Sequence, residues 1–235
     1  VDVLFLTDTT GSMYSEIAGI QSAFSGIFSA IATAYPTTDV QYGVADYKDY
    51  TDGGVYQSVG LNLGQSFTTN QASVQAAIDA MSAGGGNDSP EEQMVSLTQI
   101  ANHWTDTTTA GLDLGGRDSA QKVLIWAGDI YGHSGPSSQD DTSPVGWYPS
   151  LAETLASLNS QGILTFGLNT YGAGSGIDGS NTGEGDPGNQ ASTITSGTGG
   201  TLFNNVGSGG STIEDAIVAA ITGGRLRPHV HFTSI

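Results

Sequence analysis

The sequence has no cysteine and very few basic residues. Its 235 residues include only five lysines and arginines, against 23 aspartates and glutamates, for a formal net charge of −18. Without cysteine the chain can form no disulfide, thiol nucleophile or cysteine-ligated zinc site. With so few basic side chains no basic patch can form, which argues strongly against nucleic-acid binding. The negative charge instead favours cations, or a partner bridged through cations.

Long apolar runs are missing as well, so no direct membrane insertion is expected, and there is no signal peptide or lipidation motif. Because the first residues already resemble a strand, we expect the chain to be one domain of a longer protein. Hydrophobic residues make up 37% of the sequence, which is enough for a core, and the 35 glycines indicate many turns.

Apolar strand-like runs alternate with helical patterns along the chain. Strands are predicted at residues 3–7, 40–47, 55–63, 122–127, 163–168 and 201–203. Helices are predicted at residues 16–35, 70–81, 90–104, 151–158, 189–196 and 213–221. This alternation predicts an α/β fold with a doubly wound, mostly parallel six-stranded sheet.

A short link at residues 52–54 predicts that the strand at 55–63 is antiparallel and lies at an edge of the sheet. We expect one domain over residues 1–222, and a connector or added strand over residues 223–235.

Polar side chains gather where the predicted strands end. Asp8, Thr10 and Ser12 follow the first strand, at i, i+2 and i+4. An ordinary turn would also use these residue types. However, Asp49 follows the second strand and Asp129 follows the strand at 122–127, so all three segments meet at one edge of the sheet. Such oxygen ligands suit Mg²⁺ or Ca²⁺, and the sequence therefore predicts a metal site there.

A glycine-rich segment at residues 84–92 leads into the helix at 90–104. Its simplest interpretation is helix capping, with Ser89 as the N-cap, Pro90 in the first helical position and acidic residues in the first turn. The three glycines also allow close backbone approach, and Glu91 could then point outward into a site.

Three motifs, in order, resemble those of von Willebrand factor type A domains. They are Asp-x-Thr-x-Ser-Met at 8–13, the glycine-rich Asn-Asp-Ser-Pro-Glu loop at 87–91, and Trp-Ala-Gly-Asp at 126–129. The loop, together with residues 42–49, is most similar to the I-like domain of integrin β subunits. The resemblance covers nearly the whole chain and includes residues 198–203. It implies the Rossmann-like fold of that family, here in a prokaryotic relative.

The resemblance also implies several metal sites. Its central adhesion site, holding Mg²⁺ or Mn²⁺, falls on Asp8, Thr10, Ser12, Glu91 and Asp129. A flanking Ca²⁺ site falls on Asp49, Asp88, the Pro90 carbonyl and Glu91, with Asn87 offset by one position from the family's ligand. The other flanking site falls on Ser15 and Glu16, where one of the family's two carboxylates is missing.

A divalent-cation-dependent adhesion or ligand-binding domain at the cell surface or outside the cell is the function that the resemblance implies. An acidic group of the partner would complete the metal's coordination, with the loops at Gly11, 132–136 and 172–185 shaping selectivity. Two alternatives stay open: a cation-stabilised structural module of a large extracellular protein, and an intracellular assembly partner.

Catalysis is not expected. The chain has no P-loop and no G-x-S-x-G elbow. His133 lies near Asp129 and Ser134 in sequence, but nothing indicates a hydrolase triad. Gly174, Gly176 and Gly179 fit a dinucleotide-binding pattern, but no helix follows at once. Asp178 resembles part of a calcium loop that lacks the final Glu, and a glycine-rich insertion is the simpler interpretation.

Overall fold

Six strands form one sheet in the order β3-β2-β1-β4-β5-β6. β1 is central and pairs in parallel with β2 and β4, whereas β3 is antiparallel to β2. The strands are β1 (Asp2–Asp8), β2 (Gln41–Tyr47), β3 (Asn62–Thr68), β4 (Lys122–Gly128), β5 (Ile163–Asn169) and β6 (Leu202–Phe203). The structure, a computed structural model, describes residues 1–34, 36–49, 60–86, 89–134, 148–180, 188–207 and 209–223. The predicted fold class is confirmed.

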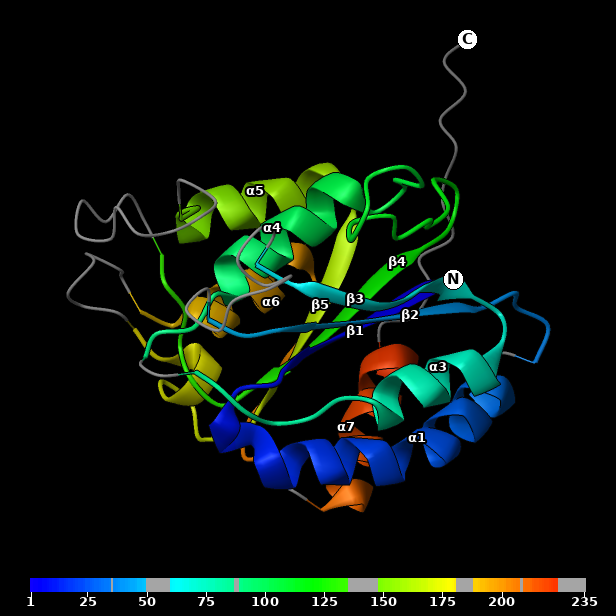
Figure 1. Cartoon of the computed structure of the whole chain (residues 1–235), viewed down its shortest axis with the longest axis horizontal. Helices are drawn as coiled ribbons and strands as arrows, with labels where there is room; N and C mark the ends of the chain where they lie inside the picture. The colour runs from blue at the N-terminus through cyan, green and yellow to red at the C-terminus, as the bar shows by residue number, and fades with distance from the viewer. Residues whose placement is uncertain are drawn as a thin grey trace, which may run out of the picture.

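Helices cover both faces of this sheet (Figure 1). On one face lie α1 (Tyr14–Ala34), α3 (Gln71–Asp79) and α7 (Gly210–Gly223). On the other lie α4 (Gln93–His103), α5 (Leu151–Ser160) and α6 (Gln190–Thr198). In the described part of the chain, short 3₁₀ helices follow β1 and β5: η1 (Gly11–Met13) and η3 (Gly176–Asp178).

The middle of β1, from Val3 to Leu6, is apolar because it is buried on both faces. Val3 and Phe5 enter the core under α1, and Leu4 and Leu6 enter the core under α4. Phe5 stacks edge-on against Phe24 of α1, with ring centroids 4.6 Å apart. A doubly covered parallel sheet thus accounts for the unbroken hydrophobic run.

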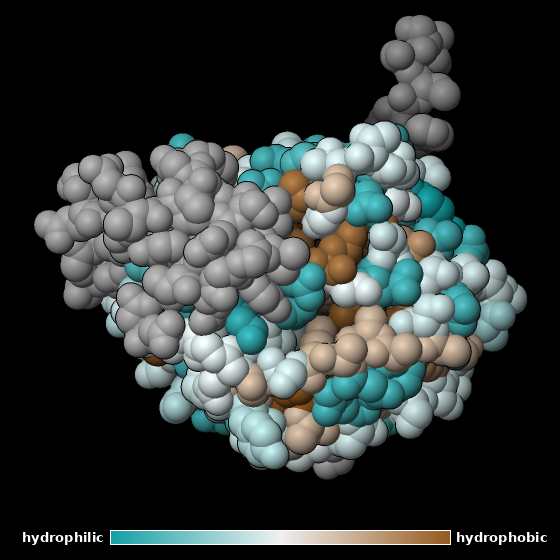
Figure 2. Space-filling model, in the orientation of Figure 1, coloured by the Kyte–Doolittle hydropathy of each residue, from teal (hydrophilic) through white to brown (hydrophobic). Residues whose placement is uncertain are grey.

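The edge strand is antiparallel, as predicted, but its position was wrong. It occupies Asn62–Thr68 rather than 55–63, and residues 50–59 lie outside the described part of the chain. Most of its residues are half-buried and its pairing with β2 contains register shifts, so its apolar pattern is weak. Figure 2, in the orientation of Figure 1, shows apolar residues in the middle of the visible surface, between the two helix layers, with a mainly polar surface around them.

The helix predicted from residue 90 begins at Gln93 instead. Glu91 forms a parallel β-bridge with Gly132, with its N–H donating to the Tyr131 carbonyl (3.2 Å). Glu92 is the N-cap and forms no side-chain capping bond, so the interpretation of Ser89 and Pro90 as capping residues was wrong. Glu91 pairs with the loop after β4, and this pairing satisfies its backbone, since its carbonyl also accepts from the His133 N–H (2.9 Å).

An ion pair closes the amino edge of the sheet, where the parallel strands begin. Asp2, fully buried at the start of β1, accepts from Nε (2.8 Å) and Nη2 (2.6 Å) of Arg117. Its other oxygen accepts from the Arg117 backbone N–H (2.6 Å).

None of the helices within the described ranges is long and apolar enough to cross a membrane. Of the connector predicted over residues 223–235, Gly223 is the last residue of α7 and residues 224–235 lie outside those ranges, so the connector stays a prediction.

Gly200 gives a test of the packing behind β5. A Cβ at this position would lie 2.0 Å from the Thr165 carbonyl oxygen, which is backbone and cannot move aside. We expect Gly200→Ala to lower the free energy of unfolding by about 1–3 kcal/mol in urea denaturation. Gly207→Ala is the matched control because its Cβ would meet nothing within 4 Å. Equal stability of the two variants would contradict this packing.

Candidate metal centre

Three oxygen-bearing side chains lie together where β1 ends. Oδ1 of Asp8 accepts from the Thr10 backbone N–H (2.8 Å) and from the Thr10 hydroxyl (2.7 Å). The Thr10 hydroxyl oxygen is 3.3 Å from that of Ser12. The tight turn into η1 therefore brings one carboxylate and two hydroxyls to a single point.

The glycine-rich segment is bound to this turn through its backbone. Gly84 N–H donates to the Thr9 carbonyl, and Gly11 N–H donates to the Gly85 carbonyl, each at 3.1 Å. Gly86 adopts a positive φ of 69°, which L-residues rarely adopt. A Cβ on Gly86 would lie 2.7 Å from Cβ of Thr10 and 3.0 Å from Oε1 of Glu91. Glu91 and Thr10 therefore flank the same glycine.

Two glutamines that the sequence analysis missed hold the third segment, which follows β4. The Gln190 side chain bonds both the N–H and the carbonyl of Gly132, each at 2.7 Å. Nε2 of Gln93 donates to the Ile130 carbonyl (2.9 Å). Both glutamines are fully buried at the first position of a helix, where their sequence context gives no sign of this role.

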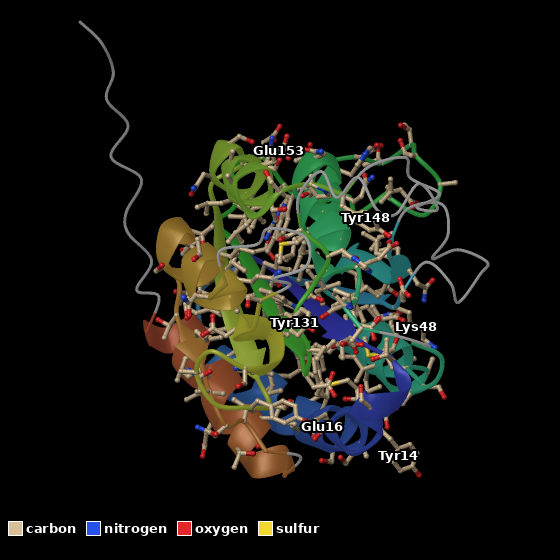
Figure 3. All side chains as sticks on the ribbon, turned by 90° about the vertical axis from the view of Figure 1, so that its left-hand side faces the viewer. Tyr14, Glu16, Lys48, Tyr131, Tyr148 and Glu153 are labelled. Carbon is tan, nitrogen blue, oxygen red and sulfur yellow. The ribbon has the colours of Figure 1, made fainter. Side chains whose placement is uncertain are left out.

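These segments line a cavity of about 480 Å³ that opens to solvent at the carboxyl edge of the sheet. Ser12, Glu91 and Asp129 line it, with Gly86 between them and Tyr171 from the loop after β5. In Figure 3, which faces this edge, Tyr131 is near the centre, Tyr14 and Glu16 of α1 lie below it, and Lys48 lies to one side. The structure thus brings the β1, glycine-loop and β4 segments together, as predicted.

Burial makes the carboxylates here hard to ionise without a counter-charge. Desolvation raises the pKa of Asp8 to about 7, although the two Thr10 bonds oppose the shift; the Asp129 charge adds to it. Burial also raises the pKa of Asp129, with the Ser12 hydroxyl acting against it and Glu16 adding to it. Desolvation, followed by the charge of Asp8, holds the pKa of the Tyr47 phenol well above its ordinary value.

The donor set fits a cation. Oδ2 of Asp8 and Oδ1 of Asp129 are buried and accept no hydrogen bond from the residues that the structure describes. Buried carboxylate oxygens are normally satisfied, so these two positions suit a metal ion. Over the same residues, no three carboxylates or imidazoles are grouped closely enough to hold a metal by themselves. Such an ion would therefore need the Thr10 and Ser12 hydroxyls as well.

The predicted flanking ligands are only partly described. Asp49 is fully buried in the loop after β2, and Pro90 is buried beside Glu91. Asn87 and Asp88 lie outside the described ranges, so their assignment as ligands stays a prediction. Ser15 donates to Oε2 of Glu16 (2.8 Å) on the exposed side of η1 and α1.

The other motifs have structural roles. Asp178 lies in η3, and its carboxylate accepts from the Ser192 N–H (2.7 Å) and hydroxyl (2.8 Å) in the first turn of α6. It thereby ties the glycine-rich insertion to that helix. The His133 ring stacks on Tyr148, with centroids 4.6 Å apart and planes at 22°.

The fold is that of the von Willebrand factor type A class. A solved structure described as a von Willebrand factor type A protein from Catenulispora acidiphila superposes with a TM-score of 0.56 at 12% sequence identity. The match covers 95% of this chain and 42% of that one, so this chain spans less than half the length of that protein. No family model and no curated protein matches the sequence. The predicted fold of this class is confirmed, and the particular resemblance to integrin I-like domains stays a prediction.

The raised pKa of Asp8 predicts how stability depends on pH in chelator-treated protein. Between the unfolded pKa, about 3.9, and the folded pKa of about 7, the folded state keeps a proton that the unfolded state releases. Asp8 therefore makes the free energy of unfolding fall as pH rises through this window, by up to about 1.4 kcal/mol per unit. Asp8→Asn should remove this contribution in urea titrations between about pH 5 and about pH 7, inside this window.

Asp46→Asn is the matched control, because Asp46 is also buried but accepts from Thr9 (2.7 Å) and Asn62 (2.9 Å). It should leave the Asp8 contribution in place. Identical pH profiles for the parent and Asp8→Asn would refute the assignment.

Proposed function

We propose that this domain binds a divalent cation at the carboxyl edge of its sheet and, through it, an acidic group of a protein partner. The observation that carries the proposal is the pair of buried oxygens, Oδ2 of Asp8 and Oδ1 of Asp129, that lack donors among the described residues. A bound cation would satisfy both oxygens and offset the cost of burying their charge.

Asp8, Thr10 and Ser12 would be the central ligands, with Glu91 and Asp129 beside them. This set supplies both carboxylate and neutral oxygens, which suits Mg²⁺ or Mn²⁺. Residues Asp49, Asp88 and the Pro90 carbonyl, with Glu91 and the offset Asn87, remain our proposed ligands for a flanking Ca²⁺. Ser15 and Glu16 form the second proposed flanking site, with one carboxylate.

The cavity supports the partner part of the proposal. When bound, the cation would supply a Lewis-acidic position for an incoming carboxylate. Glu91 and Asp129 line the cavity, and no lysine or arginine is among the described residues that do so. Without a cation the walls would repel an acidic ligand, so partner binding should require the metal.

A surface or extracellular adhesion role agrees with this proposal, as does a prokaryotic source. The main alternative is a structural module in which the cation only joins loops. It is favoured by one observation: the residues that line the cavity come from separate segments, the turn after β1, the glycine loop and the β4 loop, which a cation would join. An intracellular assembly partner is the other alternative. We propose no catalytic role.

Cation binding should raise the stability of the folded protein. A ligand that binds only the folded state adds about 2.7 kcal/mol at one hundred times its dissociation constant. Millimolar Mg²⁺ or Ca²⁺ should therefore raise the melting temperature of metal-free protein, and EDTA should reverse the rise. Asp8→Asn should lose the response, and Asp46→Asn should keep it. The metal proposal fails if stripped parent protein melts identically with and without these cations.

Gly86 offers a second test that leaves every proposed ligand in place. Gly86→Ala would force a Cβ against Thr10 and Glu91, whereas Gly84→Ala meets nothing within 4 Å. We expect calorimetric titration to show Mg²⁺ affinity at least about tenfold weaker for Gly86→Ala, equivalent to about 1.4 kcal/mol. Gly84→Ala should bind as the parent does. Equal affinities for both variants would exclude this geometry.

A further inference from the structure

An exposed tyrosine stands at the rim of the proposed centre. Tyr171, in the loop after β5, is 55% exposed and lines the cavity with Ser12 and Asp129. Within the described ranges, only Tyr14 is a comparably exposed large hydrophobic residue, at 77%. Tyr14 is two residues beyond Ser12, but it does not line the cavity. Tyr171 is therefore an aromatic surface that opens onto the centre.

The backbone of Tyr171 is fixed on both sides. Its N–H donates to Oδ1 of Asn169 (3.2 Å), and its carbonyl accepts from the Asn205 N–H (2.8 Å). Asn169 is itself fully buried, and its Nδ2 donates to the Ser175 carbonyl (2.9 Å). The ring is thus presented to solvent from an ordered loop, which limits the entropy lost when a partner packs on it.

Asp178 fixes the far end of the same loop. Its carboxylate accepts from the Gly174 N–H (3.0 Å) while it also holds Ser192 of α6. Hydrogen bonds to the buried side chains of Asn169 and Asp178 therefore anchor this loop at both ends. Rigid, exposed aromatic residues beside a pocket are typical of the positions that dominate binding energy at protein interfaces.

The chemistry of the rim indicates what Tyr171 would contact. Among the described lining residues, most are glycine, serine or acidic, and the apolar side chains are those of Ile130 and Tyr171. A group next to the partner's carboxylate therefore meets an aromatic ring and an aliphatic chain. Such a surface selects an apolar neighbour by removing its area from water.

We propose that Tyr171 is a specificity-determining residue that packs against an apolar side chain next to the acidic residue of a protein partner. This inference rests on the proposed function, since the acidic residue is held by the cation. Asn169 acts as a positioning residue by setting the backbone of Tyr171.

Synthetic capped hexapeptides test the proposal directly. Each carries one central Asp or Glu, with leucine, phenylalanine, glycine, serine or lysine beside it, and binding to the whole chain is measured in Mg²⁺ by fluorescence polarisation. Parent protein should bind the leucine and phenylalanine peptides about tenfold more tightly than the glycine peptides, because packing on Tyr171 removes the apolar side chain from water.

Three variants locate this preference. Tyr171→Ala should abolish it while keeping the requirement for an acidic residue and for Mg²⁺. Tyr171→Phe should retain it, and Tyr14→Ala, the matched exposed tyrosine outside the cavity, should leave it unchanged. Since Tyr171 is exposed, the melting temperatures of all three should stay close to that of the parent.

The failures are distinguishable. A parent that binds acidic peptides in Mg²⁺ with no apolar preference, or a preference that survives Tyr171→Ala, would overturn the role of Tyr171 alone. A parent that binds no acidic peptide with Mg²⁺ present would overturn the proposed function and this inference with it. Mg²⁺-dependent binding of oligogalacturonate in place of the peptides would overturn the assignment of a protein partner.

Discussion

Much of this structure depends on how the buried carboxylates at the two ends of β1 are satisfied. Asp2 and Asp8 are both fully buried, at opposite ends of this strand. At the amino edge, the Arg117 guanidinium and backbone N–H satisfy Asp2. At the carboxyl edge, Asp8 receives two bonds from Thr10 on one oxygen, and its other oxygen has none among the described residues. The same fold thus satisfies the carboxylate at one end of β1 with an arginine, and leaves one carboxylate oxygen at the other end without a donor among the described residues.

The elements that bury apolar side chains could be predicted from the sequence. β1, β4 and β5 are covered on both faces, so most of their residues are apolar, and the helices repeat their apolar positions at helical spacing. β3 lies at an edge and is half-exposed, so its residues carry little apolar signal, and its predicted position was several residues too early. The start of α4 was also displaced, because Glu91 pairs with Gly132 rather than with its own helix.

In the candidate site, too, some residues could be predicted from the sequence and others could not. Asp8, Thr10, Ser12 and Asp129 could be predicted because each follows a recognisable strand, and parallel strands end at one edge. Gln93 and Gln190 could not, because a buried glutamine that bonds a distant backbone resembles any other residue at the first position of a helix. Tyr171 was missed for a related reason. Its place at the cavity depends on Asn169 and Asn205, which come together only in three dimensions.

The Gln190 side chain joins α6 to a loop 58 residues earlier in the chain, and that loop in turn bridges to Glu91. The cavity wall therefore depends on contacts between segments that are synthesised far apart in time. During translation, the strand and turn that carry Asp8 leave the ribosome first, and the glutamine that secures the wall leaves much later. Contacts of such long sequence separation form late because their loops must close first. A nascent chain would thus carry its acidic side chains long before it could arrange them. The complete cavity wall would form only after the chain had folded as far as α6.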